Sequence, residues 1–300
     1  MKSKLKILCW CCTVLLLWNC SDDDNPTSFY EEVNWFEIKD NPNDALDHLI
    51  YLVYKETGIP IFYNDTIGSE TKGPDAEGNS IVRYEILNLT YRLTSDKRDI
   101  KYDLPKSRNN VRLGVEVLRK VIKEMPRDFY IHSFLLTESL RKDEGNPWIQ
   151  PVYLNIYRGL STVAIGKMDE IGEMSLAEID KFTDDIVIDL LCAYIEESGF
   201  VDFYAVSNKF SPDAPWGEIY DQWVFDYLDL TKEDCGFLSI QENYGPKYFK
   251  APTKNQDLKD YIRALKRWNE TEFQELYGEY APMIEKYHLM KLFMDKLNGK

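Results

Sequence analysis

The chain has 300 residues, of which 44% are hydrophobic and 14% aromatic, and its formal net charge is −15. This composition excludes a generally disordered protein, because enough apolar side chains are present to form a sizeable core. The negative charge argues against binding to nucleic acid or to an anionic membrane surface, since both would repel it.

The first 19 residues predict an export signal. Three lysines near the start precede an apolar run from Ile7 to Trp18, which is the layout of a secretory signal. That run is too short to span a bilayer comfortably, and no later stretch is long enough. Removal of residues 1–19 would take away three lysines and no acid, so the net charge of −15 would become −18.

Cys20 is the predicted lipidation site. The residues before it resemble a bacterial lipobox, although Trp18 and Asn19 stand where small residues are usual. The acidic run at 21–24 resembles the export tag of Bacteroidetes surface lipoproteins. We therefore expect lipid on Cys20 to hold the protein at the outer membrane, with residues 20–40 as a flexible acidic tether. An outward-facing protein is favoured over a periplasmic one, and the alternative is an ordinary cleaved signal followed by a polar linker.

Two cysteines remain for the folded part, Cys192 and Cys235, because the others leave with the signal or carry the lipid. Export would permit a disulfide between them, but two cysteines do not make a disulfide framework. We expect a buried free pair and leave the disulfide open.

The residues after the tether predict a mixture of strands and helices. Hydrophobic periodicity and a terminating glycine indicate the first helix. Pro60 restricts its strand to a sheet edge, and a stretch rich in Gly, Asp, Thr and Ser reads as a loop. The expected elements are a helix over 43–56, an edge strand over 59–63, a loop over 64–80, a strand over 81–93, a helix over 111–123, and short strands within 129–136 and 152–157.

The second half is predicted to be mainly helical. Ser175 followed by Glu178 is a capping-box pattern that opens a short helix. Residues 184–197 are apolar almost all round, which predicts a second, buried helix. No repeat or linker divides the chain after residue 40, so a single α+β domain is expected over 41–300. Further helices are predicted over 216–228, 254–268 and 270–297.

Four short motifs follow one another between residues 43 and 297. They are Leu46–Ile50 leading through Gly58–Pro60 to Tyr63, the stretch from Leu118 through Pro126 to Tyr130, the run Gly199–Ala205, and the segment from Ala281 to Tyr287. In this order they resemble a family of Bacteroidetes lipoproteins that are zinc-binding metallopeptidases. The resemblance implies a zincin-like α+β fold, with N-terminal helices, a small mixed sheet and a mainly helical C-terminal half.

The metal motif of that family is altered in this chain. Where the family carries His-Glu-x-x-His, this sequence has Asp185-Ile186-Val187-Ile188-Asp189. A zinc peptidase needs two imidazoles on one helical face and a glutamate that takes a proton from water. Here Asp185 and Asp189 replace both ligands and Ile186 replaces the base. We therefore expect no catalytic residue and no zinc or other cofactor.

Nothing else in the sequence restores the motif. The resemblance places the third ligand near Glu218 or Asp221, and Glu218 is the remnant that we favour. The histidines beyond the signal are His48, His132 and His288, and no two of them are four residues apart. An inactive homologue of the metallopeptidases is therefore expected.

The predicted helix over 184–197 carries polar groups on one side. Asp185, Asp189, Cys192 and Glu196 recur at spacings of three and four residues, so they share a face. Unpaired buried carboxylates would be costly, so partners are expected. We favour pairing with basic side chains. The alternatives are the lining of a vestigial cleft and a site for a hard cation such as calcium.

Two functions follow from this interpretation. The favoured one is a non-catalytic, surface-exposed lipoprotein that binds an extracellular peptide or glycan, or that belongs to an outer-membrane uptake complex. Candidate ligand contacts are Tyr204, Trp216 and Trp223. The alternative is an active hydrolase or metallopeptidase that uses a non-standard carboxylate site. An open groove at Asp185 and Asp189 would support binding there, whereas a cation locked onto them would make the acids structural.

Overall fold

The computed structural model describes residues 33–87, 89, 100–126, 129–143, 148–211 and 217–299. The predicted signal, the lipidation site Cys20 and the candidate contact Trp216 lie outside these ranges. Phe36–Lys300 forms one compact unit. Within the ranges that the structure describes, no helix is both long and apolar enough to cross a membrane.

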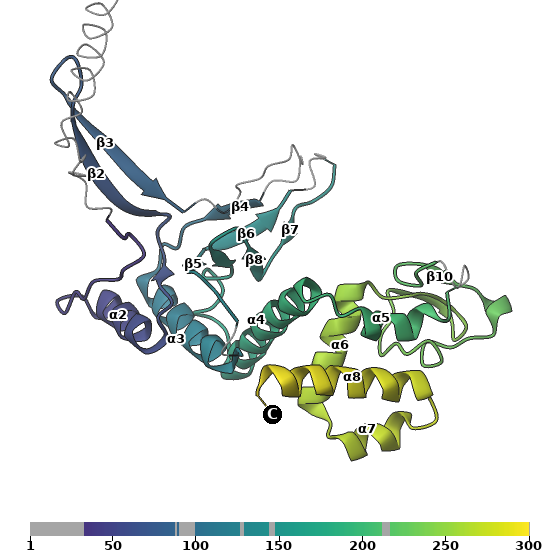
Figure 1. Ribbon diagram of the computed structural model, residues 1–300. Helices are drawn as coiled ribbons and strands as arrows, with labels where there is room; N and C mark the ends of the chain where they lie inside the picture. The colour runs from purple at the N-terminus through teal and green to yellow at the C-terminus, as the bar shows by residue number, and fades with distance from the viewer. Residues whose placement is uncertain are drawn as a thin grey trace, which may run out of the picture. The chain divides into compact units, whose positions relative to one another are not determined.

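A small mixed sheet lies in the N-terminal half (Figure 1). Its strand order is β1 (Ile61–Phe62), β5 (Phe134–Leu136), β9 (Val163–Ile165) and β8 (Ile156–Arg158). The first three strands are parallel and β8 is antiparallel to β9. β5 and β9 are buried at every position, as expected for strands covered on both faces. β1 follows Pro60 and lies at the edge, which confirms the prediction.

Two helices before and between these strands confirm the sequence prediction. α2 (Ala45–Thr57) begins after Asp44, whose carboxylate accepts hydrogen bonds from two backbone amides, and it ends at Gly58 in the left-handed region. α3 (Arg108–Glu124) begins after Ser107, which caps it in the same way. The two helices pack together, and both contribute to the main core.

The predicted loop over 64–80 is wrong. β2 (Thr66–Pro74) and β3 (Ser80–Ile86) form an antiparallel hairpin, and the turn between them is held by the Asp75 carboxylate. No side chain of β2 is buried, and its sequence lacks the apolar alternation that would have indicated a strand. β3 confirms a strand at the start of the range predicted over 81–93. A further sheet joins β4 (Ile100–Asp103), β6 (Ser139–Lys142) and β7 (Val152–Tyr153).

The C-terminal half is mainly helical, as predicted, but its helix boundaries differ. α4 (Leu176–Glu197) is one continuous helix with a capping box at Ser175, whereas two helices were expected. The predicted helix over 270–297 is instead two helices, and the second has a proline in its first turn. The helices after α4 are α5 (Val201–Asn208), α6 (Lys254–Arg267), α7 (Glu270–Tyr277) and α8 (Ala281–Leu297).

The predicted helix over 216–228 is wrong. In its described part the chain forms β10 (Trp223–Val224) and a short 3₁₀ turn, η1 (Asp226–Leu228). β10 pairs with β12 (Tyr248–Lys250), which pairs with β11 (Glu242–Gly245). One face of this sheet covers a second, smaller core. Val224 and Phe249, which are 25 positions apart in the sequence, both contribute to it. A third small core lies among β4, β5, β6 and β9. The fold is therefore α+β.

Candidate functional site

The polar face of α4 is occupied by side chains of α6. Asp185 forms an ion pair with Arg263 at 3.1 Å, and Asp189 forms one with Lys259 at 2.5 Å. The pairs run in opposite order along the two helices, which pack antiparallel. All four side chains are partly exposed. The structure therefore agrees with the favoured interpretation, in which basic side chains satisfy the two acids.

The pairing continues at both ends of this face. Asp184 contacts Lys266 at 2.5 Å, and Glu196 accepts a hydrogen bond from the Asn255 amide at 3.1 Å. The contacts of α6 thus follow a spacing of four, four and three residues from 255 to 266, which places them on one helical face. A cation bound by the α4 acids would have to displace or approach these ammonium and guanidinium groups.

Two other residues on α4 are enclosed. Ile186, at the position of the family's catalytic glutamate, is fully buried in the main core. Cys192 is also buried, and burial raises the pKa of its thiol to about 12. It and Cys235 are both unpaired and buried, as expected. Neither Ile186 nor the Cys192 thiol can act on a ligand at this face.

Glu218 does not join the α4 acids. Its carboxylate contacts Lys254, the first residue of α6, at 2.6 Å. Arg263, the partner of Asp185, lies nine residues further along α6, which corresponds to about 13 Å of helix rise. Across the part of the chain that the structure describes, no group of three His, Cys, Asp or Glu side chains could hold a metal ion. The residues present therefore do not fit the zinc that the resemblance implies.

The three histidines each have a local partner. His48 contacts Asp40 at 2.7 Å, and His288 contacts Glu270 at 3.1 Å. His132 pairs with the Tyr130 hydroxyl at 2.9 Å. The three do not converge on one cavity, so the histidines do not build an alternative centre.

Tyr204 lies at the side of the second core rather than on an open surface. Its ring packs edge-on against Phe203 and Tyr220, and the Lys254 ammonium lies 5.3 Å from its centroid. Its hydroxyl is buried and has no hydrogen-bond partner among the described residues. Burial raises the pKa of this phenol. Tyr204 is thus not free to stack on a ligand.

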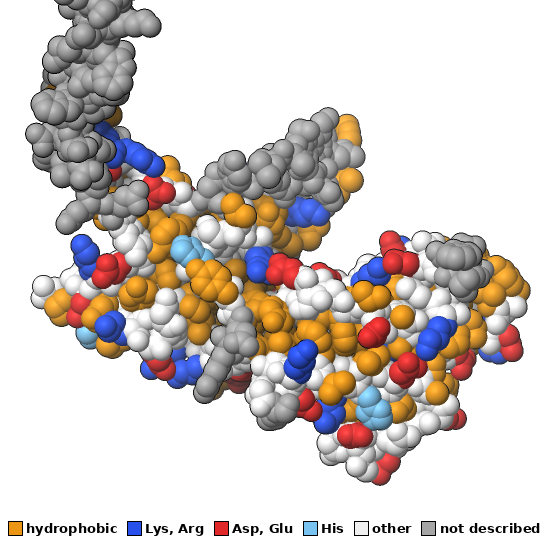
Figure 2. Space-filling model, in the orientation of Figure 1, with side chains coloured by type: hydrophobic (Ala, Val, Ile, Leu, Met, Phe, Trp, Pro, Cys, Tyr) orange, Lys and Arg blue, Asp and Glu red, His pale blue; other side chains and the backbone are white. Residues whose placement is uncertain are grey.

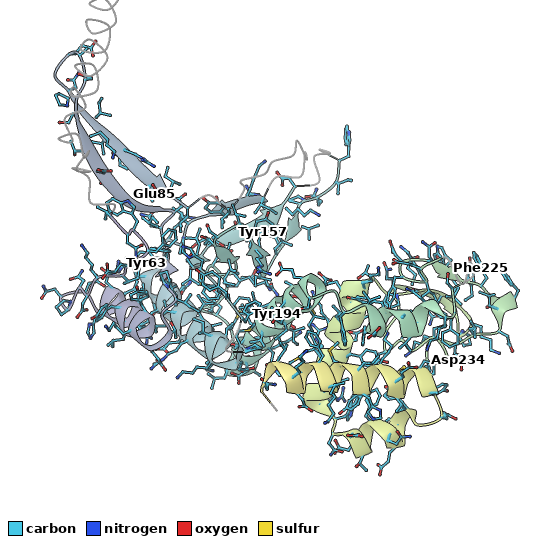
Figure 3. All side chains as sticks on the ribbon, in the orientation of Figure 1. Tyr63, Glu85, Tyr157, Tyr194, Phe225 and Asp234 are labelled. Atoms are coloured by element: carbon cyan, nitrogen blue, oxygen red, sulfur yellow. The ribbon has the colours of Figure 1, made fainter. Side chains whose placement is uncertain are left out.

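Trp223, in contrast, is half-buried and belongs to a cluster of rings on the outer face of a sheet, of which three are exposed. Side chains alternate across a strand, so Val224 and Phe249 point into the second core while Trp223 and Tyr248 occupy the outer face. Figure 2 shows hydrophobic side chains gathered over this sheet, and Figure 3 labels Phe225 there. We call this cluster the aromatic patch, and its members are Trp223, Phe225, Tyr227, Tyr244 and Tyr248.

Sequence reasoning identified one of these five residues. Tyr227 is 76% exposed, Tyr244 69% and Phe225 39%. The signal that could have found Phe225 and Tyr248 is the alternation of apolar and outer positions in residues 223–225 and 248–250, whereas Tyr227 and Tyr244 lie outside these ranges. It is weak, because each strand is only two or three residues long.

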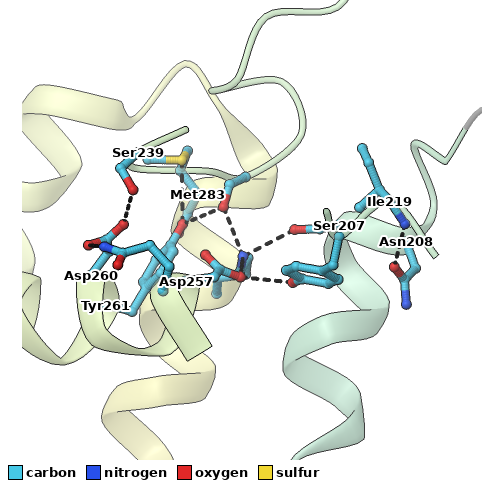
Figure 4. A network of polar contacts seen from close by, with 12 residues as sticks. Ser207, Asn208, Ile219, Ser239, Asp257, Asp260, Tyr261 and Met283 are labelled. Carbon is cyan, nitrogen blue, oxygen red and sulfur yellow. Dashed lines mark hydrogen bonds and ion pairs between the residues drawn. The ribbon is translucent and has the colours of Figure 1, made fainter. Parts of the chain in front are cut away.

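A second charged cluster is fully enclosed among α5, α6 and α8 (Figure 4). Lys286 of α8 contacts Asp257 of α6, and both side chains are at most 1% exposed. The ammonium also donates to the Gly236 carbonyl at 2.9 Å and to the Ser207 hydroxyl at 3.1 Å. The Tyr220 hydroxyl donates to the same carboxylate at 2.8 Å. This cluster joins α5, α6 and α8 and is structural, since no ligand can reach it.

Gly236 is suited to this cluster by its backbone. Its φ is 77°, in the left-handed region, where a residue with a side chain is strained. A Cβ added there would lie 3.1 Å from Lys286 and 3.2 Å from Pro282.

Comparisons with known proteins add no assignment: the chain matches no family model, no curated protein and no solved structure. The likeness to zinc-binding metallopeptidases therefore rests on the sequence motifs alone.

Proposed function

We propose that this protein is a lipoprotein, held at the outer membrane through Cys20, that binds an extracellular peptide or glycan without cleaving it. The scaffold is a zincin-like fold that has lost its metal site. The observation that carries the proposal is the pairing of Asp185 with Arg263 and of Asp189 with Lys259. Carboxylates neutralised in this way are poor metal ligands and poor general bases.

The fold supports this origin in general terms. A mixed sheet with an antiparallel edge strand shares the main core with α3 and α4, as an α+β fold requires. The binding role is supported by the aromatic patch, because large exposed apolar patches often mark interaction sites. A place in an outer-membrane uptake complex would be compatible with the same surface.

The alternative hydrolase with a non-standard carboxylate site has less support. It needs two acids that face an open cleft, one of which can hold or release a proton. On α4 the acids instead face cations of α6 at 2.5–3.1 Å.

Metal analysis of the full chain tests the proposal. After dialysis the protein should retain no stoichiometric zinc and should not cleave unstructured peptides. Retained zinc together with metal-dependent cleavage would overturn it. Labelling with a radioactive or clickable fatty acid tests the anchor: the wild-type chain should be labelled and fractionate with membranes, and a Cys20→Ser variant should not.

A further inference from the structure

The aromatic patch is a continuous set of rings. Trp223 contacts Tyr244 and Tyr248, each with centroids 5.4 Å apart, and these two tyrosines are 5.6 Å from each other. Phe225 extends the set, since it lies 5.7 Å from both Tyr248 and Tyr227. Its plane is within 23° of Tyr248 and 10° of Tyr227, so three rings have nearly parallel faces. A ligand longer than one sugar or one side chain could contact several of them.

The two lysines beside the patch each form an ion pair with an aspartate. Lys250 lies directly opposite Trp223 in the sheet and forms an ion pair with Asp221 at 2.9 Å. Lys247, next to Tyr248, contacts Asp229. These pairs leave no net positive charge that would attract phosphate or a carboxylate ligand. They do leave carboxylate oxygens and ammonium hydrogens that can bond to hydroxyl groups.

The backbone at the patch is also unusual. Asp221 and Asp229 both adopt positive φ, at 63° and 54°, on either side of β10 and η1. Side chains rarely adopt this region, and such residues are often found where a surface is shaped for a ligand. The two aspartates are also the acids that hold the lysines at the rim.

A peptide fits this surface less well than a sugar chain. Peptides commonly add a strand to a free sheet edge or insert side chains into pockets. The edge strands here are β10, with two residues, and β11, whose pairing shifts between Asn243 and Gly245. Short and irregular edges are poor templates for an added strand. Sugar rings need no such edge, because their C–H faces pack on the electron-rich faces of aromatic rings.

We infer that the aromatic patch binds a neutral glycan, whose pyranose rings stack on Trp223, Tyr244 and Tyr248 while its hydroxyl groups bond to the charged rim. This inference rests on the proposed function and specifies its ligand. Phe225 and Tyr227 extend the stacking surface beyond a single sugar. An oligosaccharide should therefore bind more tightly than its monosaccharide.

Glycan binding can be measured on the full chain purified in detergent. The probes are soluble glucan, mannan and xylan, their oligosaccharides, and the acidic polymer polygalacturonate, each titrated by calorimetry. We expect binding to at least one neutral polymer. Binding to polygalacturonate alone, or to none of these polymers, would overturn the inference.

Variants then locate the site. Trp223→Ala and Tyr248→Ala should each weaken binding about tenfold, the loss expected for one stacking contact. Tyr153→Ala is the matched control, because Tyr153 is a 67% exposed tyrosine of β7 outside the patch, and it should bind as the wild type does. Tyr244→Phe should keep most of the affinity that Tyr244→Ala loses. Circular dichroism checks that each variant folds.

The outcomes separate this inference from the proposed function. Unchanged glycan affinity in Trp223→Ala and Tyr248→Ala would overturn the patch as the site. If the protein bound unstructured peptides but no glycan, and the same variants lost peptide binding, the assignment of a glycan ligand would be overturned. The proposed function as a binding protein would then stand. Metal-dependent peptide cleavage would overturn the proposed function whatever the glycan result.

Discussion

The enclosed pair of Lys286 and Asp257 gives the sharpest test of how this fold is held together. Lys286→Met keeps the length of the side chain and removes its charge. Asp257 then retains the Tyr220 hydroxyl as donor to one oxygen, while its other oxygen has no partner among the described residues. A buried carboxylate with so little support will take up a proton, because burial raises the pKa of Asp257.

The cost of that proton sets the magnitude. At pH 7, protonating a carboxyl whose ordinary pKa is 3.8 costs about 4 kcal/mol. This agrees with the roughly 3–5 kcal/mol measured when one partner of a buried ion pair is removed. Since whole domains are stable by about 5–15 kcal/mol, Lys286→Met should remove a large part of the stability.

The pH dependence follows from the same proton. In Lys286→Met the folded pKa of Asp257 lies above its unfolded value, so the contribution of this group to stability is most favourable below about pH 3.8 and is lost as the pH rises from there. As the pH is lowered from 7 to 5, the difference in unfolding free energy between wild type and variant should therefore shrink by about 1.4 kcal/mol for each pH unit.

Urea unfolding of the full chain, followed by circular dichroism, measures these differences. The double variant Lys286→Met/Asp257→Leu removes both charges and should recover most of the loss, because apolar pairs often replace buried ion pairs without cost. Lys291→Met is the matched control, since it breaks an exposed pair with Asp295 on the same helix and should change little. If Lys286→Met were no worse than this control, or if its loss did not vary with pH, the buried-pair reasoning would be refuted.

Three further predictions follow from the structure. Asp185→Asn and Asp189→Asn should each cost less than about 1 kcal/mol in urea unfolding, because their ion pairs are partly exposed; a loss of several kcal/mol would show that the acids carry more of the fold. Ser175→Ala should lower stability by about 1 kcal/mol through loss of the α4 cap, and unchanged stability would contradict the capping box. Cys192 and Cys235 should resist a thiol reagent at pH 8 in the folded protein and react on unfolding, since burial raises the pKa of each thiol to about 12. Above pH 9 the thiols ionise in the unfolded chain but stay protonated in the folded protein, so their contribution to stability should fall as the pH rises.

Features set by neighbouring residues could be predicted from the sequence. The terminating Gly58 and the capping box at Ser175 each depend on contacts within a few positions, so each marked a helix end correctly. The shared face of Asp185 and Asp189 likewise follows from helical spacing alone. Their partners could not be predicted, because they lie on a helix some 70 residues away, and sequence spacing carries no information about it.

Features set by distant pairing could not be predicted. Residues 223–228 contain enough apolar side chains to read as a helix, but in the structure Val224 pairs with Phe249 across β10 and β12. Whether residues 223–224 form a strand depends on pairing with β12, which begins some 20 residues later. This pairing overrides the helical preference of the local sequence. The aromatic patch has the same origin, since its five rings come from three separate segments of the chain.

The ion-paired acids of α4 and the aromatic patch are separate features of this fold. The acids of α4 lie over the main core, whereas the aromatic patch lies on the sheet over the second core. A substitution among the α4 acids can therefore leave the packing of the aromatic patch unchanged, and the reverse also holds. The acids of α4 are ion-paired with basic side chains of α6, and a ligand bound at β10–β12 would not need a cleft there. Because the chain is strongly acidic and the lysines at the patch are already paired, the ligand that this surface suits best carries little charge of its own.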